Sequence, residues 1–265
     1  MSIIRVLNKI IENGEKVVLA TVVEKDGEGP LETGGKLMLD ENYKRYGTIA
    51  GGDLELLIIE KCKEIFKTRK NQLVLFNLSS RRLKEENVQA EMICGGTTKI
   101  FFEYFEPKDN LFIFGGSGNV GKEICRKSEG LDYKLHIIDK YNPNFDFDYI
   151  YHEDHKNMID YEFNKSDYII IATGSHNVDY EILKNLINKN IEFKYLGMLA
   201  SDKKINDLLK KLAKETGKKP KKIYSPIGLN IGGATPPEIA IAILAQIQTV
   251  KYNVENIKNL GVIEW

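Results

Sequence analysis

The chain has 265 residues, enough for two domains, and its 38 lysines and arginines balance 38 aspartates and glutamates, which removes any bulk electrostatic attraction to nucleic acid or an anionic membrane. Three scattered cysteines without a Cys-x-x-Cys pair exclude a disulfide framework and fit a reducing compartment. With no charged-then-apolar leader and no apolar run of roughly 20 residues, we expect a cytoplasmic protein with no membrane span and no nucleic-acid partner.

The first hundred residues combine helical and strand patterns. Apolar residues recur at helical spacing over 3–11, and a second helix is expected to begin after Gly51 and Gly52, with Asp53 as its N-cap. Their mixture with β-branched segments predicts a smaller α+β domain over residues 1–106. Its strands are expected at 16–23, 36–39, 46–49, 72–78 and 98–105.

The most informative segment lies at mid-chain, where an apolar run enters a glycine-rich loop that a helical pattern follows. This order is the start of the nucleotide-binding βαβ fingerprint. Gly116 is expected to allow the tight turn, Gly118 to let a pyrophosphate approach the backbone, and Gly121 to permit close helix packing. The alternative is a glycine-rich turn that binds nothing. The expected ligand contacts are Gly116, Ser117, Gly118, Asn119, Val120 and Gly121.

An acidic residue completes this fingerprint. Asp139 ends a second apolar run 18 residues after Gly121, where it is placed to accept a hydrogen bond from a ribose hydroxyl. Strand and helix patterns then alternate to the last helix, where Thr235 and Glu238 form a capping box. We predict a Rossmann-like parallel sheet with helices on both faces over residues 107–265. The four lysines of 218–222 are most simply a solvated loop.

Six ordered motifs resemble the xanthine dehydrogenase accessory factor family (XdhC/CoxI), and they span nearly the whole chain. The glycine loop at 116–121 is one of them. The others include Pro30-x-x-x-Gly34, Gly47-Thr-Ile-Ala-Gly51-Gly52, Cys94-Gly95-Gly96, Thr173-x-x-His176-x-x-Asp179, Gly197-Met-Leu-Ala-Ser201-x-x-Lys204 and Pro226-Ile-Gly-Leu-Asn-Ile-Gly232.

The resemblance implies a cofactor chaperone without net turnover of its own. Such a protein binds molybdenum cofactor (molybdopterin), holds it while a cysteine desulfurase replaces an oxo ligand by sulfur, and delivers it to a molybdenum hydroxylase of the xanthine dehydrogenase type. A homodimer is compatible with such a carrier. A polyanionic cofactor needs backbone donors, which the glycines could supply, and a soft ligand for the metal.

Cys94 is the candidate thiol, either as a molybdenum contact or as a transient persulfide acceptor, against the alternative of a small buried residue. Cys62 and Cys125 are expected to pack on apolar helix faces. His176 follows a strand and is a candidate for ligand contact or proton transfer, against a plain loop histidine. The remaining candidate cofactor contacts are Gly51, Gly52, Glu55, Gly95, Gly96, Thr173, Ser201, Lys204 and Gly232.

Two sets of alternatives stay open. His152 and His155 suggest either a metal site or an acidic surface loop. The fingerprint loop could receive NAD, NADP or the pterin phosphate, and the whole chain could instead be an NAD(P)-dependent oxidoreductase acting on a small substrate. Asp139 beside Lys140 favours NAD over NADP. Leu31, Asp53, Asn119 and Asn230 depart from the residues that the family usually carries.

Overall fold

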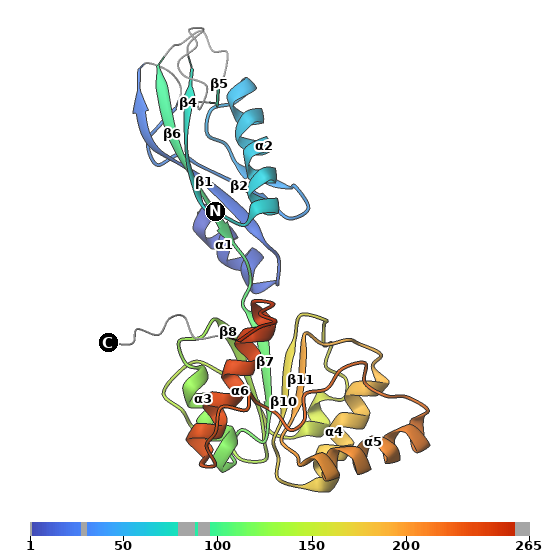
Figure 1. The fold of residues 1–265 in the computed structure, drawn as a ribbon. Coiled ribbons are helices and arrows are strands. Elements are labelled where there is room, and N and C mark those ends of the chain that lie inside the picture. The colour runs from blue at the N-terminus through green and yellow to red at the C-terminus, as the bar shows by residue number, and fades with distance from the viewer. Residues whose placement is uncertain (1, 28–30, 79–87, 90–95, 258–265) are drawn as a thin grey trace, which may run out of the picture. The chain divides into compact units, whose positions relative to one another are not determined.

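The computed structural model describes residues 2–27, 31–78, 88–89 and 96–257. The chain divides into two compact units, residues 1–107 and 108–265, and Figure 1 shows the elements of each. The predicted boundary after residue 106 differs from this division by one residue. Among the described helices, none has the length and apolar character needed to cross a membrane.

The first unit is an α+β unit built on one six-stranded sheet with the order β3-β2-β1-β6-β4-β5. Its pairs are antiparallel except for β4 with β5. The elements are α1 (Ile3–Glu12), β1 (Val17–Asp26), β2 (Lys36–Asp40), β3 (Arg45–Gly47), α2 (Gly52–Thr68), β4 (Gln72–Asn77), β5 (Val88–Gln89) and β6 (Thr97–Phe105).

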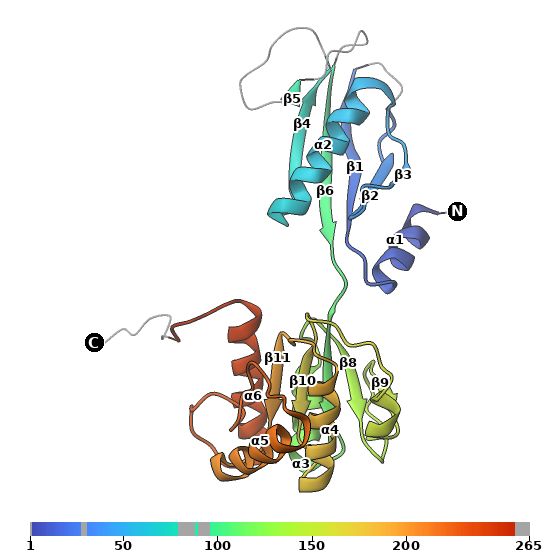
Figure 2. The same ribbon diagram turned by 90° about the vertical axis from the view of Figure 1, so that its right-hand side faces the viewer.

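Side-chain alternation along β1 explains why a helix lies on each face of this sheet. Val18 and Ala20 belong to the cluster that includes α2, whereas Val17 and Leu19 belong to the cluster that includes α1. Figure 2 shows α2 lying along the sheet. Burial on both faces accounts for the apolar runs that predicted these strands.

The second unit is a parallel five-stranded sheet with the order β11-β10-β7-β8-β9, and it confirms the predicted α/β class. The chain runs outward from β7 to β9 and then returns to pair β10 with β7, so a topological switch point lies between β7 and β10. The elements are β7 (Asp109–Phe114), α3 (Asn119–Ser128), β8 (Tyr133–Ile138), β9 (Ile150–His152), the 3₁₀ turn η1 (His155–Met158), β10 (Tyr168–Ile171), α4 (His176–Asn188), β11 (Tyr195–Met198), α5 (Asp202–Thr216) and α6 (Pro236–Lys251).

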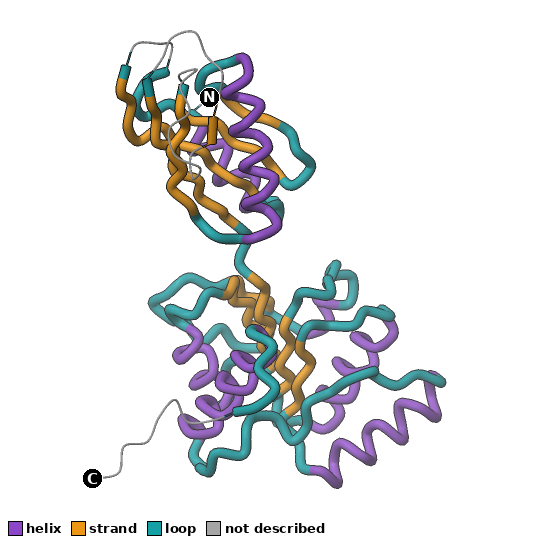
Figure 3. Tube along the Cα trace, turned by 45° about the horizontal axis from the view of Figure 1, so that its top comes forward, coloured by secondary structure: helices purple, strands orange, loops and turns teal. Residues whose placement is uncertain are grey.

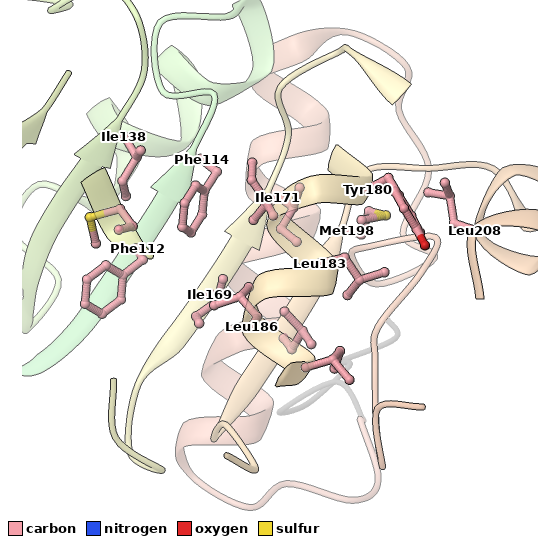
Figure 4. Close-up of a cluster of buried hydrophobic side chains, with 14 of the residues drawn as sticks. Phe112, Phe114, Ile138, Ile169, Ile171, Tyr180, Leu183, Leu186, Met198 and Leu208 are labelled. Atoms are coloured by element: carbon pink, nitrogen blue, oxygen red, sulfur yellow. The ribbon is translucent and has the colours of Figure 1, made fainter. Parts of the chain in front are cut away.

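Helices cover both faces of this sheet, as Figure 3 shows. Phe112 and Phe114 of β7 face the cluster formed with α4 and α5, part of which Figure 4 displays. Leu111 and Ile113, the alternate residues of the same strand, face α3 and α6. A strand buried on both faces has no polar alternation, which is why its sequence is a continuous apolar run.

The start of α2 differs from its prediction. Gly51, with φ of 71°, is the N-cap, and Asp53 lies inside the first turn instead of capping it. The carboxylate of Glu55 accepts a hydrogen bond from the Gly51 N–H at 3.1 Å. A side chain one turn into the helix therefore organises the entry that was assigned to Asp53.

Candidate functional site

The glycine loop between β7 and α3 is held by close backbone packing. Gly115 has φ of 91°, and a Cβ on it would lie 2.3 Å from the carbonyl oxygen of Ala172. The tight turn therefore falls on Gly115 and not, as predicted, on Gly116, whose added Cβ would meet the Ile137 side chain at 2.5 Å. A Cβ on Gly121 would lie 2.0 Å from the Gly115 oxygen, so the expected close helix packing is present.

The loop leaves the start of α3 open to a ligand. Gly118 is the N-cap and is exposed, as is Asn119. The N–H groups of Asn119, Val120 and Gly121 belong to the first turn, where no acceptor exists within the helix. In this described helix the first turn carries no acidic side chain. The geometry suits an anion such as a phosphate.

Asp139 connects the end of β8 to this loop. Its Oδ2 accepts a hydrogen bond from the Ser117 N–H at 2.9 Å, and its Oδ1 accepts one from the Tyr141 N–H at 3.2 Å. The Ser117 hydroxyl donates to the Tyr141 carbonyl oxygen. A carboxylate has about four acceptor positions, so Asp139 retains capacity for a ligand hydroxyl while it positions the loop.

A cleft of about 550 Å³ opens where β7, β8 and β10 end. Gly115, Asp139 and Thr173, which follow these three strands, all line it. This is the switch point of the sheet, the place where open α/β sheets bind ligands. Carboxylates of Glu153 and Asp154 add to Asp139 along the same wall, so this part of the cleft suits hydroxyl groups better than phosphates.

Asp179 of α4 organises the β10–α4 connection from beneath. It is 1% exposed, and its Oδ1 accepts a hydrogen bond from the Thr173 hydroxyl at 2.6 Å. Its Oδ2 lies 2.8 Å from the Lys204 ammonium, whose side chain is 14% exposed. Two predicted site residues are therefore brought together by an aspartate that was noted in a motif and not chosen. Its seven-residue motif with Thr173 was the only signal.

The other predicted residues of this unit occupy simpler positions. His176 is exposed as the first residue of α4, and it is absent from the cleft lining. Ser201 is the N-cap of α5, and its hydroxyl accepts a hydrogen bond from the Lys204 N–H at 3.4 Å. Gly232 has φ of 88° with open space around its Cα. The predicted capping box between Thr235 and Glu238 is present.

In the first unit, Glu55 is a structural anchor. Its carboxylate, in a residue that is 5% exposed, pairs with Arg45 and accepts hydrogen bonds from the Thr48 hydroxyl and from the Ile49 and Gly51 N–H groups. Burial acts to raise the pKa of Glu55, but these hydrogen bonds and the Arg45 charge outweigh it and lower that pKa. The Gly51 N–H is consequently committed within the protein.

Gly96 is also committed to packing. It has φ of 99°, and a Cβ there would lie 2.2 Å from the Asp26 carbonyl oxygen. Gly52, with φ of 62°, has open space around its Cα at the start of α2. Cys94 and Gly95 lie outside the described residues. Anion donors in the described part of this unit therefore reduce to the first turn of α2, which contains Asp53 and Glu55.

Cys62 and Cys125 are buried on helices, as predicted. Burial raises the pKa of each thiol to about 12, so neither supplies thiolate near neutral pH. Among the described residues they do not fit a metal ligand or a sulfur carrier.

The histidines form a feature that the sequence did not indicate. His136 Nδ1 lies 3.1 Å from His152 Nε2, and His136 Nε2 lies 3.3 Å from Asn110 Oδ1. Asn110 in turn donates to the buried carboxylate of Asp167 at 2.9 Å. His155 instead contacts Asp154 and Glu181. Across the part of the chain that the structure describes, no group of three or more metal-ligating side chains occurs, so the suggested site at His152 and His155 is not formed.

Known proteins match the chain in both units. A family model described as the XdhC Rossmann domain matches residues 111–247, and one described as the XdhC and CoxI family matches residues 10–77. The Escherichia coli protein YqeB, described as uncharacterized, is 27% identical over 96% of this chain and 47% of its own length. A Bacillus subtilis protein described as a probable xanthine dehydrogenase component is 28% identical over 57% of this chain and 46% of its own length.

The chain spans about half the length of these curated relatives. The crystal structure of a xanthine dehydrogenase from Bacillus halodurans has the same fold, with a TM-score of 0.50, 20% sequence identity and 98% coverage of both chains. The family model that covers the second unit includes the glycine loop, Asp139, Asp179 and Lys204.

Proposed function

This chain belongs to the XdhC and CoxI family, and from that premise we propose that it is an accessory factor that binds molybdenum cofactor and assists its sulfuration and insertion into a molybdenum hydroxylase of the xanthine dehydrogenase type. The observation that carries the proposal is the open first turn of α3 at the switch-point cleft. Its free N–H groups offer a site for the phosphate of the cofactor.

The residues of the second unit fit the phosphate-bearing end of such a ligand. The N–H groups of Asn119, Val120 and Gly121 would hold the phosphate, and exposed Gly118 leaves room for it. Asp139 and the carboxylates beside it would accept hydrogen bonds from hydroxyl or amino groups on the same ligand. The cleft thus separates an anion-binding loop from a wall that repels anions, which orients a ligand with one charged end.

The metal-bearing end requires a different group. When bound, molybdenum cofactor supplies the metal centre whose oxo ligand is exchanged for sulfur. Cys62 and Cys125 are unsuited to contact it because they are buried and protonated. We assign this role to Cys94 on the basis of its Cys-Gly-Gly motif, with a cysteine desulfurase as the sulfur donor.

Anaerobic purification of the protein from its host tests the proposal. Mass spectrometry should detect a co-purifying pterin with the parent protein, and Gly118→Val should reduce the amount because its side chain occupies the space above the loop. Deletion of the gene should leave the hydroxylase with an unsulfurated, inactive cofactor. Full hydroxylase activity in the deletion strain would overturn the proposal.

Asp139 keeps a second candidate function in view, that of an NAD(P)-dependent oxidoreductase. An acid at the end of the second strand of a Rossmann sheet accepts from the ribose of NAD, and Asp139 occupies that position. Calorimetric titration with NAD and NADP discriminates the two functions. Saturable NAD binding with turnover of a small substrate would favour the oxidoreductase, whereas lack of binding by both nucleotides would remove it.

A further inference from the structure

A second concave feature of the Rossmann unit lies at the sheet edge opposite to the cleft. A groove of about 360 Å³ is bounded by the connection from α4 to β11 and by the segment 218–222 that follows α5. A neighbouring hollow of about 620 Å³ shares Ile191, Glu192, Phe193 and Lys222 with it and extends to the residues before β10. Both lie where β10 and β11 begin, whereas the cleft lies where the strands end.

Positive charge is concentrated around this groove. The linings of the groove and the hollow contain one carboxylate, Glu192, among the described residues. Glu192 pairs with Lys221 at 2.6 Å, in contact with solvent on both sides. The whole chain has zero net charge, so this is a local surplus. The lysines that line the two features are Lys165, Lys194, Lys218, Lys219, Lys221 and Lys222.

The base of the groove is apolar. Ile187 and Leu196 are buried beneath it, and Ile191 and Phe193 are half-buried along it. Pro220 closes the opposite side. A ring of ammonium groups around an apolar base matches a ligand that carries an apolar side chain between negative charges.

We propose that this groove binds an acidic segment of a partner protein, with an apolar side chain of that segment seated among Ile187, Ile191 and Phe193. The aromatic rings argue against a single-stranded nucleic acid, which needs free faces for base stacking. Tyr224 stacks on Tyr195 at 4.7 Å, and the Lys222 ammonium lies 4.7 Å from its ring centre. Phe193 packs edge-on to Phe163.

The groove and the cleft occupy opposite edges of one sheet, so an acidic segment bound at the groove leaves the cleft accessible. This binding function goes beyond the proposed cofactor role and is independent of it. Its charged rim implies binding that weakens with salt, and its apolar base implies a part of the affinity that salt does not remove.

Fluorescence anisotropy of the full chain with a labelled peptide tests the proposal. The probe is a short peptide with a central Leu-Phe pair between acidic residues, and its comparison peptide has Ser-Gly in place of Leu-Phe. We expect saturable binding of the first peptide and at least about tenfold weaker binding of the second, because the apolar pair supplies the buried area.

Matched charge-reversal variants locate the site. Replacing Lys218, Lys219, Lys221 and Lys222 by Glu should weaken binding about tenfold or more. Replacing the exposed Lys67, Lys70, Lys203 and Lys210 by Glu makes the same change in net charge elsewhere and should alter affinity less than about threefold. Ile191→Ser tests the apolar base with little change in charge, and thermal unfolding verifies that each variant is folded.

Three results would overturn the proposal. They are the absence of saturable peptide binding, an equal loss in the two charge-reversal variants, and tighter binding of an oligonucleotide of equal charge than of the Leu-Phe peptide. The last result would assign the groove to nucleic acid. None of these readouts depends on the molybdenum cofactor, so a failure here leaves the accessory role to its own test.

Discussion

The Asp179 carboxylate on α4 lies 2.8 Å from the Lys204 ammonium on α5, and the same carboxylate accepts the hydroxyl hydrogen of Thr173. One buried aspartate therefore links the first turns of two helices to the loop that borders the cleft. The charge of Lys204, which the sequence offered as a free phosphate contact, is largely compensated within the protein.

Asp179→Asn should destabilise the second unit by about 3 kcal/mol, because it leaves the Lys204 ammonium mostly buried without its counter-charge. Lys204→Met should also be destabilising, since it leaves the Asp179 carboxylate uncompensated. The double variant should lose less than the sum of the two single losses. Urea unfolding at neutral pH measures all four proteins, and strict additivity would contradict the pairing. Asp202→Asn, at an exposed position of α5, is the control.

Gly118 and Gly121 should respond differently to alanine. A Cβ on Gly118 would lie 3.3 Å from the Gly115 oxygen, which the loop accommodates, whereas one on Gly121 would lie 2.0 Å from the same atom. We expect Gly121→Ala to cost about 2 kcal/mol or more and Gly118→Ala less than about 1 kcal/mol. Thermal and urea unfolding give these values. Similar losses for the two variants would contradict the observed packing.

Gly118→Val should impair ligand binding while the protein remains folded. Gly118 has φ of −70°, which valine adopts readily, so the change acts on the space in front of the α3 first turn. Calorimetric titration with pyrophosphate should give an affinity at least about tenfold below that of the parent. Equal affinities would indicate that the loop has only a structural role.

Glu55 should make the stability of the first unit depend on acid. Its pKa is lowered in the folded state, so its contribution is present above its unfolded pKa of about 4.3 and is lost as the pH falls through the folded pKa. Glu55→Gln should remove this dependence and cost about 1–3 kcal/mol at pH 7, because an amide cannot satisfy four donors. Urea unfolding between pH 7 and pH 3 compares the two proteins. Parallel curves for parent and variant would contradict the assignment.

His136 should destabilise the second unit in acid. Burial and the neighbouring His152 lower the pKa of His136 to about 3, below the value of about 6.5 in the unfolded chain. The unfolded state therefore binds an additional proton between these values, and stability should fall by up to about 1.4 kcal/mol for each pH unit as the pH drops from 6.5 to 3. His136→Asn should flatten this slope. Hydrogen exchange of β8 amides across this range reports it, and an unchanged slope would exclude His136 as its source.

The sequence predicted most of the secondary structure because the relevant signals are local. Every strand expected over 16–105 is present, and the glycine spacing located the turn from β7 into α3. The errors were also local in scale, since the tight turn lies at Gly115, one residue before its predicted position, and the N-cap of α2 lies at Gly51, two residues before Asp53. In both cases the deciding contact comes from outside the pattern, from Ala172 and from Glu55.

What the sequence alone determined is the α/β class, the two-part organisation and the family resemblance, because apolar periodicity and motif spacing are properties of the chain itself. Only the tertiary structure decided which polar groups are already satisfied. Asp179 and Lys204 are 25 positions apart, Asn110 and Asp167 are 57 apart, and Glu55 collects donors from a separate loop. Such partners are chosen by how strands and helices pack, since burial forces each charge to find a neighbour wherever the fold places one.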